Sequence, residues 1–381
     1  MLSGSSNSSG RVQLKVKKQI LLDNFNIIRK LAGNCNILTV LKANAYGTGD
    51  QALSLIARQA GTDRIGVADM SEALHIRQSV GNDIPIQILG VVSPAELPEA
   101  VRTANMVLPV ESLAMAQAVS DEAAQQGKTV KIHVIIDTGM GRVGLLKDNF
   151  AAEISAVKAL PNLEVEGIYS HFPCAGIPGE AGTVQQIEDF KRTLCELRQQ
   201  GVEFDLRHLA ASDGILCQEA ARREPFNMVR LGLCWYGLNQ DAAEKAVGLQ
   251  RSLELTTCVG AVRKMPANST IGYNRTCTLQ RDTMVATICA GYADGLPLAL
   301  SNAGRVLING VSCPVLGRVS MDYTMVDVSN VPGKVEWGTP VTLLGCNGNE
   351  CIEFTEWAKF KNTHVHDILC ALGNRVERVY C

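Results

Sequence analysis

The sequence lacks the features that would direct a protein to a polyanion or a bilayer. Positive and negative charges nearly cancel, with 36 Lys+Arg against 38 Asp+Glu in 381 residues, and no long run carries one sign. This balance argues against nucleic acid as a partner and favours a small-molecule substrate. No uncharged apolar run approaches the ~18 residues that a membrane helix needs, and no signal-peptide pattern opens the chain. A cytoplasmic protein is therefore expected.

Cysteine spacing typical of a zinc site is also missing. The 13 cysteines include no C-x-x-C pair, and several lie inside apolar runs, as Cys234 and Cys289 do. Reduced thiols in the core of a cytosolic protein are expected, and no metal site is predicted. Residues 1–10, MLSGSSNSSG, are typical of a flexible linker or the remnant of a tag. If the natural protein has a membrane segment, it lies upstream of this chain.

Short apolar segments alternate with stretches of helical period in the first part of the chain. The segments expected as strands span residues 36–43, 64–68, 86–90, 105–109, 131–137, 165–171, 206–210 and 228–233. The stretches 50–61, 111–127 and 182–201 repeat apolar residues at three and four spacings, and each ends at glycine. Eight strand–helix units predict an α/β fold, a (β/α)8 barrel of the TIM type over residues 11–244.

The pattern changes after about residue 245, where strand and turn signals dominate. The expected strands lie in LELTTCVGAVRKM (253–265), TMVATICAGYA (283–293), RVLINGVSCPVLG (305–317), YTMVDVS (323–329) and TPVTLLG (339–345). One late segment, IEFTEWAKFKN (352–362), is compatible with a helix. We therefore predict a second, mainly β domain over residues 245–381.

Unusual polar residues follow several of the predicted barrel strands. They are Lys42 after the first strand, Arg142 at the end of DTGMGR after the fifth, His171 after the sixth, Ser212 after the seventh, and Arg230 and Gly232 at the eighth. Barrel enzymes place their chemistry on the loops after the strands, so these residues are expected to meet at one mouth. Singly, each has another explanation: a solvated lysine, a glycine-rich turn, a core histidine or a helix-capping serine.

Together these residues fit a cofactor that carries both a phosphate and an aldehyde. A serine and backbone amides near a glycine suit a phosphate, because amides and hydroxyls can converge on the anion. A lysine amine at the same mouth suits an aldehyde. Pyridoxal 5′-phosphate has both groups and is the predicted cofactor.

The chain resembles the alanine racemase family of barrel-type (fold type III) pyridoxal-phosphate enzymes. The resemblance runs in the family's order through LKANAYGTGD, DTGMGRVG, SHFPCAG, HLAASDG, MVRLGLCWYGL, IGYNRTCTL, AGYADGLP, LGRVSMDYTMVDVS and NRVERVY. These segments cover nearly the whole chain after the linker. The resemblance implies a head-to-tail homodimer in which the second domain of each subunit completes the other's site.

The same resemblance implies how the cofactor is held. Lys42 would hold it as a Schiff base, and its phosphate would contact Tyr46, Ser212, Gly232 and the amide of Leu233. Arg230 would face the pyridine nitrogen, and Arg142 would contact the phenolic oxygen and help to place the substrate carboxylate. A permanently charged guanidinium cannot accept the nitrogen's proton, so the ring remains a weaker electron sink. This disfavours side reactions such as transamination.

Racemisation needs a proton removed from one face of the α carbon and returned on the other. The resemblance assigns one face to Lys42 and the other to Tyr273 of the partner subunit. Free tyrosine has a pKa near ~10, so a cationic surrounding is needed to lower it. The resemblance makes His171 the candidate, because the matching histidine of the family links this tyrosine to the arginine. Tyr273 could instead be a turn aromatic packed on an interface. The residues expected to line the entrance or bind the carboxylate across the dimer are Tyr292, Met321 and Asp322.

Two positions depart from the family pattern. Many relatives carry a carbamylated lysine seven positions before Arg142, where this chain has Ile135, so another residue such as Asp137, or an anion, must orient the arginine. Asn374 stands where typical alanine racemases have a tyrosine that narrows the pocket near the cofactor phosphate. The asparagine leaves more room, and its amide offers a donor and an acceptor to a substrate side chain with a hydroxymethyl group. Neutral drift would explain the same change.

An asparagine at position 374 resembles the serine-active branch of the family. This branch consists of the membrane-anchored serine/alanine racemases of vancomycin-resistant bacteria, whose D-serine ends altered peptidoglycan precursors. A racemase of serine and alanine is therefore predicted, with alanine alone as the close alternative. A barrel-type amino-acid decarboxylase would share the lysine and the phosphate site, but Tyr273 in IGYNRT argues against it. The large second domain argues against a non-catalytic pyridoxal-phosphate carrier.

Overall fold

The computed structural model describes residues 10–146, 150–239 and 241–381, and the predicted linker at residues 1–10 lies almost wholly outside them. Eight parallel strands close a barrel in which the last strand pairs with the first. They are β2 (Asn36–Val40), β3 (Arg64–Val67), β4 (Ile86–Ile88), β5 (Met106–Val110), β6 (Val130–Ile135), β7 (Leu163–Tyr169), β8 (Leu206–His208) and β9 (Met228–Leu231). The predicted barrel is confirmed.

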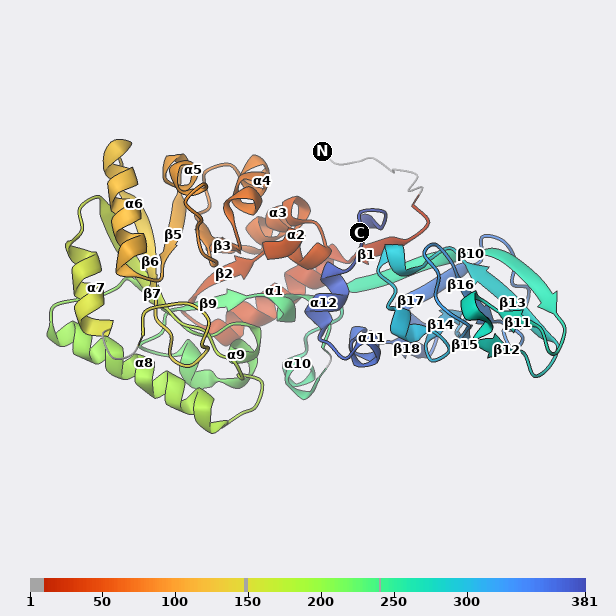
Figure 1. Ribbon diagram of the computed structural model, residues 1–381. Helices are drawn as coiled ribbons and strands as arrows, with labels where there is room; N and C mark the ends of the chain where they lie inside the picture. Colours follow the sequence, from red (N-terminus) through yellow and green to blue (C-terminus); the bar gives the residue numbers. More distant parts are fainter. Residues whose placement is uncertain (1–9, 147–149, 240) are drawn as a thin grey trace.

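Helices cover the outside of the barrel strands (Figure 1). They are α1 (Lys18–Ala32), α3 (Asp50–Ala60), α4 (Met70–Val80), α5 (Leu97–Arg102), α6 (Leu113–Gln125), α7 (Phe150–Ala159) and α8 (Ala181–Gln199). Two short segments, α2 (Lys42–Gly47) and α9 (Ser212–Cys217), follow strands β2 and β8 at the mouth of the barrel. The helices α3, α6 and α8 form where the sequence predicts them, because apolar residues at three and four spacings bury one stripe of each helix. In α3 that stripe includes Leu53, Ile56 and Ala57, and Gly61 ends the helix in the left-handed conformation that glycine tolerates.

The second domain is built on a nine-stranded sheet with the order β18-β17-β14-β15-β16-β13-β10-β1-β19. Its strands are β1 (Gln13–Val16), β10 (Leu253–Met265), β13 (Thr283–Ile288), β14 (Arg305–Ile308), β15 (Val311–Leu316), β16 (Thr324–Asp327), β17 (Pro340–Asn347), β18 (Glu350–Ile352) and β19 (Glu377–Tyr380). A small ladder pairs β11 (Thr270–Ile271) with β12 (Cys277–Thr278). Three helices complete the description, α10 (Ala242–Val247), α11 (Phe354–Lys361) and α12 (Val365–Cys370).

The first strand of the chain belongs to this second sheet and not to the barrel. β1 pairs antiparallel with β10 and parallel with β19, so both ends of the described chain meet beside β10 (Figure 1). The predicted barrel range of 11–244 therefore begins too early. A short isolated strand gives no sequence signal of its partner, because pairing over hundreds of residues is decided by tertiary structure.

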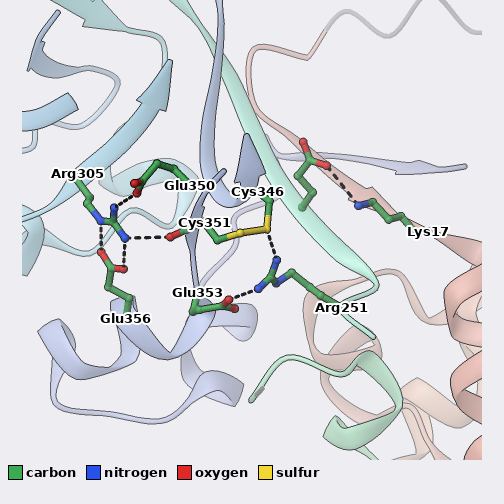
Figure 2. Close-up of a disulfide and its surroundings, with 9 residues drawn as sticks. Lys17, Arg251, Arg305, Cys346, Glu350, Cys351, Glu353 and Glu356 are labelled. Atoms are coloured by element: carbon green, nitrogen blue, oxygen red, sulfur yellow. Dashed lines mark hydrogen bonds and ion pairs between the residues drawn. A yellow bond between two sulfur atoms is a disulfide. The ribbon is translucent and has the colours of Figure 1, made fainter. Parts of the chain in front are cut away.

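One pair of cysteines departs from the expectation of reduced thiols. Cys346 and Cys351 lie opposite each other in the β17–β18 hairpin and form a disulfide (Figure 2). Arg251 donates a hydrogen bond to the Cys346 sulfur at 2.9 Å and also pairs with Glu353. The other eleven cysteines are free. Among the described helices, none is long and apolar enough to cross a membrane.

Candidate active site

A cavity of about 720 Å³ lies at the carboxyl ends of the barrel strands. Its wall includes all eight residues predicted to bind the cofactor: Lys42, Tyr46, Arg142, His171, Ser212, Arg230, Gly232 and Leu233. They come from β9 itself and from the segments that follow β2, β6, β7, β8 and β9. Residues far apart in the sequence therefore meet at one mouth, as the barrel prediction requires.

The lysine is carried by an unusual left-handed turn. Residues 43–46 have φ values of 54°, 54°, 51° and 57°, although none of them is glycine. For non-glycine residues this conformation costs roughly 1–2 kcal/mol each. Hydrogen bonds hold the turn in place: Glu72 accepts from the Ala43 N–H at 2.6 Å, and Asn44 accepts from the Asp50 N–H at 2.9 Å. Strain that the surroundings maintain in this way is typical of a functional site.

Because of this turn, the side chains of Lys42 and Tyr46 lie in different surroundings. Lys42 stands in the open mouth, whereas the ring of Tyr46 is buried, with only 5 % of its surface exposed. The walls of the cavity and the positive charge of Arg142 lower the pKa of the Lys42 amine. A larger share of that amine is then neutral, which is the form that attacks an aldehyde or accepts a proton.

Tyr46, Ser212 and Gly232 form a cradle at the back of the cavity. A methyl group on Gly232 would lie 2.8 Å from the Tyr46 hydroxyl and 3.3 Å from the Ser212 hydroxyl, so both oxygens face the space above the glycine. Burial raises the pKa of Tyr46, which keeps its hydroxyl a donor. Ser212 accepts from the Cys234 N–H at 3.2 Å, so its own proton is available to another acceptor.

The backbone adds donors to the same cradle. Leu233 begins the 3₁₀ helix η3 (Leu233–Tyr236), and the first N–H groups of a helix have no carbonyl partner within it. Hydroxyls and free amides around a glycine suit a phosphate, because they can surround an anion without a metal ion. A side chain larger than glycine would fill the space. The cradle therefore fits the phosphate of the predicted cofactor.

Arg230 is fixed from two sides by its terminal nitrogens. Nη2 donates to the Ser170 and Leu209 carbonyls at 2.8 and 2.9 Å and to His171 Nδ1 at 3.0 Å, while Nη1 donates to His208 Nδ1 at 2.9 Å. Its Nε–H makes none of the hydrogen bonds found among the described residues. Burial lowers the pKa of Arg230 to about 10, so it still carries its charge at neutral pH. The guanidinium thus presents a charged, non-accepting edge to the cavity.

His171 is neutral, which corrects the expectation that it supplies a cation. Burial and the charge of Arg230 lower its pKa to about 3. Because Nδ1 accepts from Arg230, the proton of the neutral ring belongs on Nε2. His171 can therefore donate a hydrogen bond to a phenolate, and the nearby positive charge comes from the arginines.

The loop after β6 orders its backbone around Asp137. The carboxylate accepts from the N–H groups of Gly139 and Met140 at 2.8 Å and of Arg142 at 3.1 Å. Asp137 therefore holds the backbone of Arg142. Its carboxylate does not take the place of the carbamylated lysine that many relatives carry at the position of Ile135. In the described part of the chain, the Arg142 guanidinium has no hydrogen-bond partner. Ile135 is buried and lines a small second cavity beside Arg142 and His171.

The remaining predicted residues lie outside this cavity. Its described wall does not include Tyr273, Tyr292, Met321, Asp322 or Asn374. Tyr273 begins η4 (Tyr273–Arg275), next to β11 and β12 at the end of the second domain that lies farthest from the barrel (Figure 1). Its side chain is 70 % exposed, and Met321 is 51 % exposed. Large apolar side chains exposed in this way are typical of a surface that another molecule covers.

The second domain contributes residues to the cavity that sequence reasoning missed. His364, Val365 and His366 line it, and the His366 ring contacts the Tyr46 ring edge-on at 5.5 Å. Burial lowers the pKa of His366 to about 4. The H-V-H sequence gave no indication of this role, since the approach of α12 to α2 depends on the packing of the two domains.

Comparison with known proteins gives a consistent result over most of the chain. Residues 16–240 match the family "Alanine racemase, N-terminal domain", and residues 252–380 match "Alanine racemase, C-terminal domain". The alanine racemase of Methanococcus maripaludis is 34% identical over 94% of this chain and 95% of its own length.

Two solved structures agree closely with the fold. The alanine racemase from D-cycloserine-producing Streptomyces lavendulae superposes with a TM-score of 0.91 at 28% identity, covering 98% of each chain. The alanine racemase from Bartonella henselae, described with covalently bound pyridoxal phosphate, has a TM-score of 0.87 at 25% identity and covers 97% of this chain and 99% of its own.

Proposed function

Because the chain belongs to the alanine racemase family, we propose that it is an amino-acid racemase that interconverts L- and D-alanine with pyridoxal 5′-phosphate as its cofactor. The observation that supports this most strongly is the meeting of the Lys42 amine, the Arg230 guanidinium and the Gly232 cradle in one cavity. An amine, a charged partner for a ring nitrogen and a phosphate site are the three groups that this cofactor requires.

Each part of the cofactor has residues that would hold it. Lys42 would bind it covalently, and Tyr46, Ser212, Gly232 and the Leu233 amide would bind its phosphate. Bound pyridoxal phosphate supplies an electron sink for negative charge at the substrate's α carbon. Arg230 would face the ring nitrogen as a permanent donor, which limits that sink and restrains transamination.

Two bases would move the α proton. The lowered pKa of Lys42 favours a neutral amine that accepts a proton on one face. Tyr273 of the partner subunit would serve the other face, because η4 of one chain lies far from its own barrel (Figure 1). The Nε2–H of His171 would hydrogen-bond the tyrosine oxygen and stabilise its ionised form. The enzyme would therefore be a homodimer with shared sites.

The substrate carboxylate would be placed by residues of both subunits. Arg142 lines the cavity with a guanidinium that no described residue engages, and it would attract an anion. Tyr292, Met321 and Asp322 would narrow the entrance from the partner subunit. In one chain, Asp322 accepts from Arg375 at 2.7 Å, which holds this segment in place.

Alanine is the leading substrate because the relatives described above are alanine racemases. Serine is a second candidate, favoured by Asn374. This residue is exposed in the turn after α12, the helix that carries Val365 and His366 to the cavity. In place of the tyrosine of typical relatives, an asparagine leaves more room and offers an amide to a hydroxymethyl group. The product in either case is a D-amino acid of the kind used in peptidoglycan precursors.

Incubation with L-alanine and with L-serine in deuterated water tests the proposal. A racemase exchanges the α proton and forms the D-isomer without releasing carbon dioxide. A decarboxylase of the same fold would release carbon dioxide, and a cofactor carrier would do neither. No exchange with any amino acid by the cofactor-loaded protein would contradict the proposed function.

Asn374→Tyr tests the substrate preference. If Asn374 serves serine, kcat/KM for serine falls roughly 10-fold while that for alanine changes little, because the added ring removes space and a hydrogen-bond partner. Asn82→Tyr, at another exposed asparagine, is the matched control. If Asn374→Tyr changes kcat/KM equally for serine and alanine, Asn374 has no special role for serine and alanine remains the leading substrate.

A further inference from the structure

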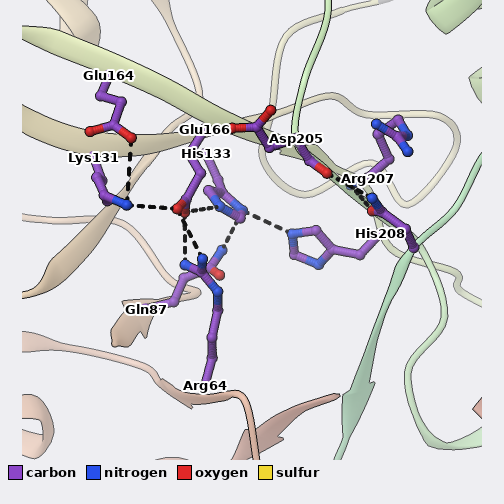
Figure 3. Close-up of polar contacts among 10 residues, drawn as sticks. Arg64, Gln87, Lys131, His133, Glu164, Glu166, Asp205, Arg207 and His208 are labelled. Carbon is purple, nitrogen blue, oxygen red and sulfur yellow. Dashed lines mark hydrogen bonds and ion pairs between the residues drawn. The ribbon is translucent and has the colours of Figure 1, made fainter. Parts of the chain in front are cut away.

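A chain of buried hydrogen bonds continues from Arg230 into the barrel core, away from the cavity. Figure 3 shows the part of this chain that joins His208, His133 and Glu166. Arg230 Nη1 donates to His208 Nδ1 at 2.9 Å, His208 Nε2 lies 3.0 Å from His133 Nδ1, and His133 Nε2 lies 3.1 Å from Glu166 Oε2. His133 and His208 are fully buried and Glu166 is 6 % exposed. Neither His133 nor Glu166 lines the cavity, so the function proposed above gives them no role.

The carboxylate at the end of this chain fixes the direction of every bond in it. An ionised carboxylate only accepts hydrogen bonds, so His133 must carry its proton on Nε2. The other nitrogen, Nδ1, is then an acceptor, and it accepts from His208 Nε2 and from the Gln87 amide at 3.1 Å. With its proton on Nε2, His208 leaves Nδ1 to accept from Arg230. Burial lowers the pKa of both histidines, which agrees with two neutral rings.

Charges near the amino-terminal ends of the strands keep Glu166 ionised. Arg64, the first residue of β3, donates to both of its oxygens at 2.7 and 2.9 Å, and Lys131 donates at 3.0 Å. Burial alone would raise the pKa of Glu166, but the bonds from His133 and Arg64 outweigh it and the pKa is lowered. The carboxylate therefore remains an acceptor throughout the neutral range.

The barrel is shaped to hold these rings in place. A Cβ on Gly167 would lie 2.5 to 2.7 Å from three atoms of the His133 ring, so only glycine leaves room for it. The Tyr169 ring stacks on His208 with centroids 4.7 Å apart and an angle of 17° between the rings. Both histidines are thus confined, and rotation of either ring would break the chain.

We propose that Glu166 and His133 are positioning residues, which fix the hydrogen-bond direction of His208 and so hold the Arg230 guanidinium with its Nε side toward the ring of the cofactor. The proposal deepens the racemase function and rests on it. Without an acceptor at His133, the buried Nε2–H of His208 is left without a partner, so the ring is no longer held with Nδ1 toward Arg230. The guanidinium then loses one of its anchors and shifts relative to the ring nitrogen.

His133→Phe removes the acceptor while keeping an aromatic ring, and Thr39→Val is the matched control. Thr39 is also fully buried in the barrel and shares a 2.8 Å hydrogen bond with Thr62, but among the described residues it makes no hydrogen bond to the histidine chain. In the holoenzyme, ¹⁵N NMR of the histidine rings reports the tautomer of His208, and the racemisation assay gives kcat and KM. Cofactor binding is followed by visible absorbance.

We expect His208 in the parent protein to carry its proton on Nε2, and the Nε2 resonance to shift in His133→Phe because the hydrogen bond of this N–H is lost. The variant should keep its cofactor, because Lys42 and the cradle are untouched. Its kcat should fall roughly 10- to 100-fold with little change in KM, which corresponds to about 1.4 to 2.8 kcal/mol. Thr39→Val should keep both the tautomer and kcat.

Glu166→Gln provides a second test if His133→Phe does not fold. An amide can turn either its oxygen or its nitrogen toward His133, so a partial loss of the hydrogen bond from His208 to His133 and an intermediate kcat are expected. Unchanged kcat with an unchanged His208 Nε2 resonance in either folded variant would overturn the proposal, as would an equal loss of kcat in Thr39→Val. If the parent protein racemises nothing, the proposed function fails, while the tautomer of His208 still reports on the hydrogen-bond chain itself.

Discussion

Filling the phosphate cradle is the most direct test of how this chain holds its cofactor. In Gly232→Ala the new methyl group would lie 2.8 Å from the Tyr46 hydroxyl and 3.3 Å from the Ser212 hydroxyl. The first distance is too short for a carbon–oxygen contact, so the Tyr46 ring must move. That ring is buried and packs edge-on against the rings of Tyr236 and His366, and it has little room to do so.

The magnitude follows from the hydrogen bonds that the phosphate would lose. A hydrogen bond to a charged group contributes about 1.5 to 3 kcal/mol. Loss of the Tyr46 bond alone therefore weakens cofactor binding roughly 10- to 150-fold in Kd. Because the displaced Tyr46 ring is buried, the variant should also lose some stability, so its folding is checked before the titration.

Titration of the cofactor-free protein with pyridoxal phosphate, followed by visible absorbance, measures this change. Pyridoxal lacks the phosphate and should bind Gly232→Ala and the parent protein alike. Gly176→Ala is a control near the same mouth, where the nearest atom to the new methyl group would be a carboxylate oxygen of Asp213 at 3.6 Å. Equal Kd values for pyridoxal phosphate in Gly232→Ala and the parent protein would refute the cradle.

Two further predictions concern stability. Glu166→Gln should lower the free energy of unfolding at neutral pH by about 3 kcal/mol, because it leaves Arg64 and Lys131 without a buried carboxylate. Since the folded-state pKa of Glu166 is depressed, the difference from the parent should be full above the ordinary glutamate value of about 4.3 and shrink as the pH falls below it, measured by urea unfolding. The double variant Cys346→Ser/Cys351→Ser should lose about 2 kcal/mol, the value for a short closed loop, and reduction of the parent should reproduce that loss. A reductant-insensitive parent would contradict the disulfide.

Strands buried on both faces are the part of this fold that the sequence shows most clearly. Each of the eight predicted segments overlaps a barrel strand, because a parallel strand covered inside and outside reads as a short apolar run. The β10 strand matches its predicted range of 253–265 at both ends. The helices α3, α6 and α8 form within their predicted stretches for the same local reason, a regular apolar period.

Local signals failed where distant parts of the chain decide the conformation. Residues 43–46 have no glycine, so nothing in the sequence predicts a left-handed turn; Glu72 and Asp50 hold it from outside. The β1 strand joins the second sheet because β10 and β19 offer it partners on both sides.

The sequence by itself determined the chemistry of this protein, since the identity of Lys42, Arg230 and Gly232 sets which cofactor groups can be bound. Only the tertiary structure decided how those groups behave. Burial and neighbouring charges fixed the neutral state of His171, and the hydrogen-bond chain through His133 fixed the direction in which Arg230 is held. The physical reason is that protonation and orientation depend on distances between atoms that lie far apart along the chain and become neighbours only when the barrel closes.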